Sequence, residues 1–214
     1  MKEQIQIFEP TKKSANLILV AITVFAFFVM QFWEKSITEG TFYGHTTAFL
    51  LQHGALYGPS IRQGEWYRLV THMFLHGDIW HLGNNMLILF CLGNALEHYV
   101  GKILYVSIYF LSGILAGLGS VVYNTTSTVS VGASGAVFGV VGAMAWLVLK
   151  NIGRLEGFTG SRMLMFILLS VYAGFADQRV DNAAHVVGLI SGFLLAMLLC
   201  RKRPVLSDET EGFL

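Results

Sequence analysis

Six mainly apolar segments alternate with polar segments along the chain, a pattern typical of a protein whose helices cross a membrane several times. They cover approximately residues 15–32, 81–99, 103–123, 134–149, 163–175 and 183–200. A helix needs about 20 apolar residues to cross a bilayer, with a range of roughly 17 to 25. Because the fourth and fifth segments are shorter, we expect them to start or stop inside the bilayer, against protein or water.

The composition indicates the same class. Of the 214 residues, 54% are hydrophobic and 13% are charged, whereas a soluble domain has roughly 25% charged residues. The net charge of +1, without a basic stripe, argues against a nucleic-acid partner. The predicted fold class is an all-α membrane protein with six transmembrane helices. Residues 14–200 would form its one membrane domain, and the polar segments 1–13 and 201–214 would form short cytoplasmic ends.

The distribution of Lys and Arg predicts the orientation, because cytoplasmic loops carry more of these residues. With the N-terminus inside, ten of the 14 basic residues fall on the inner side and four on the outer side. We therefore expect both termini in the cytoplasm. The polar start precedes an apolar run that is too long for the core of a signal peptide, so the first segment is expected to remain as a span.

This orientation places polar residues of three separate segments on the same side of the membrane. The second, fourth and sixth segments then run from outside to inside, with His81, Ser134 and His185 near their starts. At a rise of 1.5 Å per residue, all three residues lie within roughly 10 Å of the outer helix ends. A site built from them would open to the extracytoplasmic side.

The connection between the first two apolar segments, residues 33–80, is long for a membrane loop and rich in aromatic residues. Loops of this length are usually functional. Aromatic residues at the membrane edge predict an element that lies partly in the headgroup region.

Ser134 and His185 are the candidate catalytic pair. A serine hydroxyl is a weak nucleophile without a base, and His185 is the one histidine in the last four apolar segments. Taken alone, Ser134 is also explained by a hydroxyl that bonds to a helix carbonyl or across an interface. An ionisable residue such as His185 inside a span indicates function by default. Close helix approach, which the pair requires, is favoured by small residues at four-residue spacing: Gly135, Gly139, Gly188 and Gly192.

Two further polar residues share one face of the second segment. His81 and Asn85 are four positions apart, and both side chains can donate hydrogen bonds. Beside Ser134 they would stabilise the oxyanion of a tetrahedral intermediate. The alternative is that they cap or pin the long loop.

A metal site is a weaker interpretation of His81 and of the two histidines before it in the chain. His72, His76 and His81 could in principle bind zinc, but Glu65 is the only glutamate near them, and no His-Glu-x-x-His motif is present. Cys91 and Cys200 have no metal-ligand spacing and fit buried packing positions. We expect no metal and no cofactor.

Four motifs, in order along the chain, resemble those of the rhomboid intramembrane serine proteases. They are Trp66-Tyr67-Arg68, His81-Leu82-Gly83-Asn84-Asn85, Gly132-Ala133-Ser134-Gly135 and Ala184-His185-Val186-Val187-Gly188. The spacing of His72, His76 and His81 is also similar to that of the family. The resemblance covers about residues 54–195. It implies a six-helix bundle with a Ser–His dyad that cleaves transmembrane segments of other proteins.

The resemblance implies roles for the residues that match its motifs. Ser134 would be the nucleophile and His185 the general base. His81, Asn85 and the backbone N–H of Ser134 would form the oxyanion hole.

Supporting roles follow from the same resemblance. Gly132 would let the preceding loop approach the site, and Phe138 would pack on the catalytic histidine, where many relatives have Tyr. Trp66 and Arg68 would hold the long loop in place. Glu97 matches a carboxylate that we expect to be structural.

Asp181 lies four residues before His185 on the same helical face and could orient the imidazole, and Asp177 is a more distant candidate. The resemblance to a dyad argues against such a third member.

Two functions of other classes remain as alternatives. A catalytically inactive rhomboid-like protein would bind transmembrane clients without cutting them, but typically lacks the serine or the histidine. A transporter or channel would need a relay of ionisable residues across the bilayer, and this sequence has none. The expected partners are therefore transmembrane protein substrates and the lipid bilayer. The expected location is a plasma membrane, of bacterial type because the N-terminus does not resemble a transit peptide.

Overall fold

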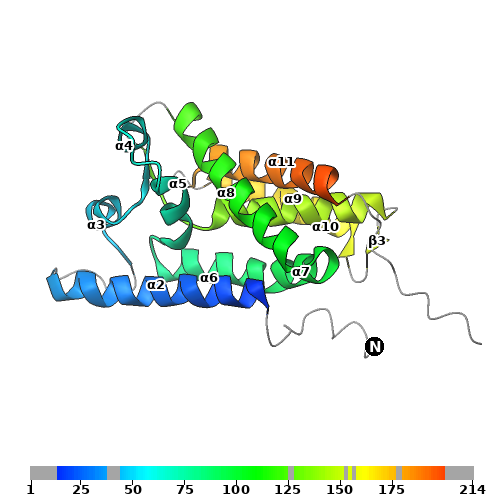
Figure 1. Cartoon of the computed structure of the whole chain (residues 1–214), viewed down its shortest axis with the longest axis horizontal. Coiled ribbons are helices and arrows are strands. Elements are labelled where there is room, and N and C mark those ends of the chain that lie inside the picture. Colours follow the sequence, from blue (N-terminus) through cyan, green and yellow to red (C-terminus); the bar gives the residue numbers. More distant parts are fainter. Residues whose placement is uncertain are drawn as a thin grey trace, which may run out of the picture.

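The computed structural model describes residues 14–37, 44–124, 128–151, 154–155, 158–176 and 180–200, and these residues are mostly helical (Figure 1). The predicted cytoplasmic ends, 1–13 and 201–214, lie outside the described residues, so the domain bounds stay a prediction.

Each predicted apolar segment coincides with helical structure, and the ends differ from the prediction by a few residues. The elements are α2 (Ala15–Ile37), α6 (Ile79–Ile88) continued by η2 (Leu89–Gly93) and α7 (Asn94–Val100), α8 (Lys102–Tyr123), α9 (Ser134–Lys150), α10 (Gly160–Ala176) and α11 (Asn182–Leu199).

Among the described residues, four helices are long and apolar enough to cross a membrane. They cover Ala15–Glu34, Ile79–Val100, Lys102–Tyr123 and Asn182–Leu199, while Ser134–Lys150 and Gly160–Ser170 are shorter apolar helices. The two short helices are the fourth and fifth segments, as their length predicted. The chain is thus a multi-pass membrane protein, and a count of six spans remains a prediction.

Helix α9 forms the centre of the bundle, and every residue from Gly135 to Met144 is buried. A Cβ added at Gly188 of α11 would lie 2.1 Å from the carbonyl oxygen of Gly135 of α9. One added at Gly192 would lie 1.9 Å from the carbonyl oxygen of Gly139. The two backbones are therefore in direct contact, which confirms the close approach predicted from the glycine spacing.

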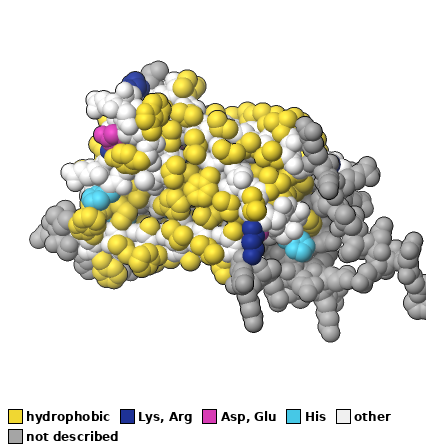
Figure 2. All heavy atoms as spheres, viewed as in Figure 1, with side chains coloured by type: hydrophobic (Ala, Val, Ile, Leu, Met, Phe, Trp, Pro, Cys, Tyr) yellow, Lys and Arg dark blue, Asp and Glu magenta, His cyan; other side chains and the backbone are white. Residues whose placement is uncertain are grey.

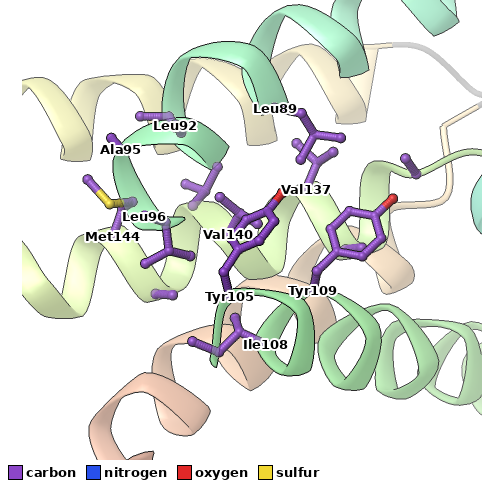
Figure 3. Close-up of a cluster of buried hydrophobic side chains, with 14 of the residues drawn as sticks. Leu89, Leu92, Ala95, Leu96, Tyr105, Ile108, Tyr109, Val137, Val140 and Met144 are labelled. Carbon is purple, nitrogen blue, oxygen red and sulfur yellow. The ribbon is translucent and has the colours of Figure 1, made fainter. Parts of the chain in front are cut away.

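The main hydrophobic cluster packs α8 and α9 against the second helical segment (Figure 3). Tyr105 and Tyr109 of α8 are fully buried beside Val137 and Val140 of α9, and Leu89 of η2 covers them. This cluster fixes α9, and with it Ser134 at its first residue, relative to α6.

The second segment is not a continuous α-helix, because η2 is a π-helical turn. Such a turn leaves backbone carbonyls without their usual partner. Asn16 of α2 compensates by donating its Nδ2 to the Leu89 carbonyl at 2.9 Å and to Asn94 Oδ1 at 2.7 Å. Glu97 of α7 accepts hydrogen bonds from Ser14 Oγ and from the backbone N–H groups of Ala15 and Asn16. Glu97 is thus structural, since it caps the first turn of α2.

The long connection between α2 and α6 folds into a lobe of short elements beside the bundle (Figure 1). It contains α3 (Thr47–Gln52), β1 (Leu56–Tyr57), α4 (Gly58–Arg62), α5 (Arg68–Thr71) and the 3₁₀ turn η1 (His72–Phe74).

Two short antiparallel ribbons add to the helices that the sequence predicts. Strand β1 pairs with β2 (Val129–Ser130), which lies just before Ser134, with Leu56 opposite Ser130. Strand β3 (Arg154–Leu155) pairs with β4 (Phe158–Thr159) between α9 and α10. The β1–β2 ribbon joins the lobe to the loop that carries the candidate nucleophile.

The bundle presents apolar side chains outward. Phe25 of α2, Ile103 of α8 and Leu168 of α10 are among many large hydrophobic residues that are mainly exposed. Figure 2 shows one face whose described surface is mostly hydrophobic, with few charged side chains. Such a surface fits the apolar interior of a bilayer.

Candidate active site

Ser134 is the first residue of α9, directly after a sharp turn of the backbone at Gly132. Gly132 has a φ of 122°, a conformation that residues with a Cβ rarely adopt. Its N–H donates to the His72 carbonyl at 3.0 Å, which fixes the loop before Ser134. Ser134 itself is only partly buried, whereas its neighbours Ala133 and Gly135 are buried. The hydroxyl therefore lies at the edge of the packed core.

His185 lies on the second helix of the candidate pair and contacts the helix of Ser134. Its imidazole stacks on the Phe138 ring, with ring centroids 4.3 Å apart and an angle of 18° between the planes. Phe138 is one helical turn after Ser134, so both side chains lie on the same face of α9. The imidazole is thus placed over the face that carries the Ser134 hydroxyl.

The two groups are neighbours without a hydrogen bond between them. Among the described residues, the Ser134 hydroxyl is not bonded to the imidazole, and His185 Nδ1 is buried without a partner. The two side chains thus belong to helices in direct contact, and no bond joins them in this structure.

His81 and Asn85 of α6 reach the turn that precedes Ser134. A Cβ added at Gly132 would lie 2.6 Å from His81 Nε2 and 3.6 Å from Asn85 Nδ2. Both donors thus face the backbone beside Ser134, and Gly132 leaves the space that they occupy. Asp78 is the N-cap of α6 and accepts from the His81 N–H at 2.8 Å, which fixes the start of the helix.

His76 is a contributor to this site that the sequence indicates only through its spacing from His72 and His81. Asn85 Nδ2 donates to His76 Nε2 at 3.0 Å, and the Ala133 N–H donates to the same nitrogen at 3.5 Å. Its ring also packs edge-on against that of His81, with centroids 5.0 Å apart. His76 therefore holds both candidate oxyanion donors and the loop of the nucleophile.

His72 and His76 are neutral at physiological pH. Burial lowers the pKa of His76 to about 3 and the pKa of His72 to about 4, because charging a buried imidazole is unfavourable. A neutral His76 keeps an unprotonated nitrogen as the acceptor for Asn85.

Arg68 and Trp66 of the long loop differ in burial and in their contacts. Arg68 is buried and donates to the carbonyls of Leu51 and Ala55, each at 2.8 Å, and to the Glu65 carboxylate at 2.5 Å. The three bonds tie the lobe together, and the one from Arg68 to Glu65, with another from the Tyr67 hydroxyl, lowers the pKa of Glu65. The Trp66 side chain is 60% exposed. Its ring therefore lies largely at the surface of the lobe, and the expected role of Trp66 in holding the loop in place stays a prediction.

Among the described residues, no hydrogen bond joins Asp181 to the His185 imidazole. It is the N-cap of α11, and its carboxylate accepts from the Ala184 N–H at 3.0 Å and from the side chains of Ser120, Asn124 and Ser130. Asp177 lies outside the described residues.

Within the described part of the chain, no group of three or more His, Cys, Asp or Glu residues could hold a metal ion. Cys91 and Cys200 are free thiols.

An apolar cleft of about 390 Å³ separates the second helical segment from α10. Its lining comes from α6, η2, β4 and α10: Leu87, Ile88, Cys91, Leu92, Phe158, Arg162, Met163 and Phe166.

The chain is similar in sequence to a family of known proteins. Residues 63–202 match the model of the Rhomboid domain. The chain is 33% identical over 198 residues to "Rhomboid protease GluP" of Bacillus subtilis, covering 92% of this chain and 37% of that protein. It is 36% identical over 148 residues to "Putative rhomboid protease YdcA" of the same organism, covering 69% and 74%.

A plant protein, "RHOMBOID-like protein 5" of Arabidopsis thaliana, is 36% identical over 168 residues, covering 77% of this chain and 54% of that protein. The chain thus spans between about a third and three quarters of the length of these relatives. The family model covers well over half of the chain, and the multi-pass membrane protein described here belongs to the rhomboid family.

Proposed function

We propose that the protein is an intramembrane serine endopeptidase that cleaves transmembrane segments of other membrane proteins. The observation that carries this proposal is the placement of His185 on Phe138, over the face of α9 that starts with Ser134. The names of GluP and YdcA as proteases support the same activity.

In the proposed reaction, Ser134 Oγ attacks the carbonyl carbon of the scissile peptide bond while His185 accepts the hydroxyl proton. The carbonyl oxygen becomes negative and accepts hydrogen bonds from His81, Asn85 and the Ser134 N–H. His185 then returns the proton to the leaving nitrogen as the C–N bond breaks. Water hydrolyses the resulting ester of Ser134, again with His185 as the base.

The proposed substrate is a transmembrane helix that unwinds locally before it is cut. A helix holds its carbonyls in internal hydrogen bonds, so attack requires that some of these bonds open first. Entry from the lipid phase would pass between the second segment and α10. The apolar cleft shows that these two elements are already apart along part of their length, toward the ends that are remote from Ser134.

The proposed topology has six spans with both termini in the cytoplasm. The charge distribution supports it, and it would open the site of Ser134 to the extracytoplasmic side of a plasma membrane.

Cleavage in proteoliposomes tests the activity. Purified protein is reconstituted with a fluorescent single-span substrate and compared with Ser134→Ala and His185→Ala. We expect cleavage by the wild type and none by either variant, with no effect of metal chelation. Equal cleavage by wild type and Ser134→Ala would refute the dyad, whereas substrate binding without cleavage by the wild type would favour the inactive binder.

The entry route has a separate test. A bifunctional thiol reagent joins Cys91 of η2 to an introduced cysteine, Met163→Cys of α10, across the cleft. We expect the cross-link to abolish cleavage of the transmembrane substrate, with the same reagent on Cys91→Ser, Met163→Cys as the control. Full activity of the cross-linked protein would exclude this gate.

A further inference from the structure

Asp181 joins three segments of the chain that meet at the end of the bundle where α8 ends and α11 begins. Its carboxylate accepts from Ser120 Oγ in the last turn of α8 and, at 3.2 Å, from Nδ2 of Asn124, the C-cap of that helix. It also accepts from Ser130 Oγ of β2 at 2.7 Å and from the Ala184 N–H of α11 at 3.0 Å. One side chain therefore ties α8, β2 and α11 to each other.

These contacts use the full hydrogen-bonding capacity of the carboxylate. An ionised carboxylate has about four acceptor positions on its two oxygens. Oδ1 accepts from Asn124 and Ala184, and Oδ2 accepts from Ser120 and Ser130. Asp181 thus has no position left for the His185 imidazole, and a triad role is not built into this geometry.

The hydrogen bond between Ser130 and Asp181 is close in sequence to both members of the proposed dyad. Ser134 follows Ser130 by four residues, and His185 follows Asp181 by four residues. A bond that fixes Ser130 against Asp181 therefore limits how far the Ser134 loop and the His185 helix can move apart. Ser130 also pairs with Leu56 of β1, so the same set of contacts links the lobe to α8 and α11.

We propose that Asp181 is a positioning residue for the dyad, which sets the separation of Ser134 and His185 by clamping β2 and the first turn of α11 to α8. It acts through Ser130 and Ala184, and it takes no part in proton transfer. The kinetic test of this proposal rests on the proposed function, whereas the hydrogen-exchange test is independent of it.

The kinetic test measures acylation of Ser134 by a small fluorescent β-lactone, whose ring opens as its carbonyl is transferred to the serine oxygen and which needs neither the gate nor helix unwinding. We expect Asp181→Ala to slow acylation by about 10- to 100-fold, because displacements near 1 Å can cost roughly 100-fold in rate. Asp181→Asn keeps one acceptor oxygen and can donate to the serine hydroxyls, so it stays within about fivefold of wild type. With a transmembrane substrate, kcat falls and KM stays nearly constant in Asp181→Ala.

Ser14 provides a matched control at the opposite end of the bundle. Its hydroxyl donates to the Glu97 carboxylate at 2.7 Å, the same distance and chemistry as the bond from Ser130 to Asp181. We expect Ser130→Ala and Ser14→Ala to lower Tm by similar amounts, whereas only Ser130→Ala slows acylation. An equal loss of acylation rate in both variants would show a general effect of stability and overturn the proposal.

Hydrogen exchange gives the structural readout. In Asp181→Ala, the amides of the β1–β2 ribbon and of the first turn of α11 should lose protection together, while Ser14→Ala leaves them unchanged. Acylation by Asp181→Ala at the wild-type rate would reject the clamp and leave the proposed activity intact. A wild type that shows the linked protection but never reacts at Ser134 would reject the activity and leave the clamp intact.

Discussion

Gly188 offers a sharp test of the contact between the two helices that carry the proposed dyad. A Cβ at this position would lie 2.1 Å from the Gly135 carbonyl oxygen and 3.3 Å from the Gly135 Cα. An ordinary contact needs at least 3.4 Å, so α9 and α11 must separate by about 1.3 Å in Gly188→Ala. The obstructing atoms are backbone atoms of a central buried helix, and no side-chain rotation can relieve the overlap.

Two effects of known size follow from this displacement. Overpacking of a close-packed core costs about 1–3 kcal/mol of unfolding free energy. A shift near 1 Å in the relative position of reacting groups costs roughly 100-fold in rate. We therefore expect Gly188→Ala to lower Tm and to reduce the acylation rate of Ser134 by about two orders of magnitude.

Gly83→Ala is the matched control, since Gly83 is also a helical glycine but has nothing within 4 Å of an added Cβ. Replacing glycine by alanine at an open helical position raises the unfolding free energy by about 0.5–1 kcal/mol. Tm is followed by tryptophan fluorescence in detergent and acylation by in-gel fluorescence. If Gly188→Ala retains both the Tm and the acylation rate of Gly83→Ala, the direct backbone contact of α9 and α11 is refuted.

Three further predictions concern the parts that support the site. Arg68→Lys keeps the charge but cannot span two carbonyls and a carboxylate at once, so the unfolding free energy should fall by about 1–3 kcal/mol in thermal melts. Glu97→Gln removes the charged acceptor that caps α2, and a similar fall of about 1.5–3 kcal/mol should appear in Tm without a specific loss of acylation rate. For His76, the folded-state pKa of about 3 lies below the unfolded value of 6.5, so below pH 6.5 the unfolded chain binds a proton that the folded chain does not. Stability should thus decrease on acidification by up to about 1.4 kcal/mol per pH unit for this residue, and His76→Gln should show a flatter dependence of Tm on pH between 7 and 5.

The helices follow from the sequence because membrane segments are defined by local composition. The six apolar segments coincide with the observed helices, and the glycine spacing predicts the contact of α9 with α11. The π-helical turn η2 is not predictable in this way. It is stabilised by Asn16 from another helix, through a bond between residues far apart in the chain.

Long-range contacts also limit how much of the candidate active site the sequence predicts. Ser134 and His185 are recognisable from residue type and from their small neighbours. The bonds of His76 to Asn85 and of Asp181 to Ser130 depend on how separate segments pack, and no local pattern encodes them. Sequence spacing alone leaves open whether Asp181 orients the imidazole, whereas the packing directs its carboxylate to other partners.

The central claim is that Ser134 is a nucleophile activated by His185. Intact-protein mass spectrometry after treatment with a fluorophosphonate, followed by peptide mapping, measures this directly. The account predicts a single adduct on Ser134 in the wild type and none in His185→Ala when both proteins are folded. An unreactive Ser134 in the folded wild type, or equal labelling of Ser134 in His185→Ala, would contradict it.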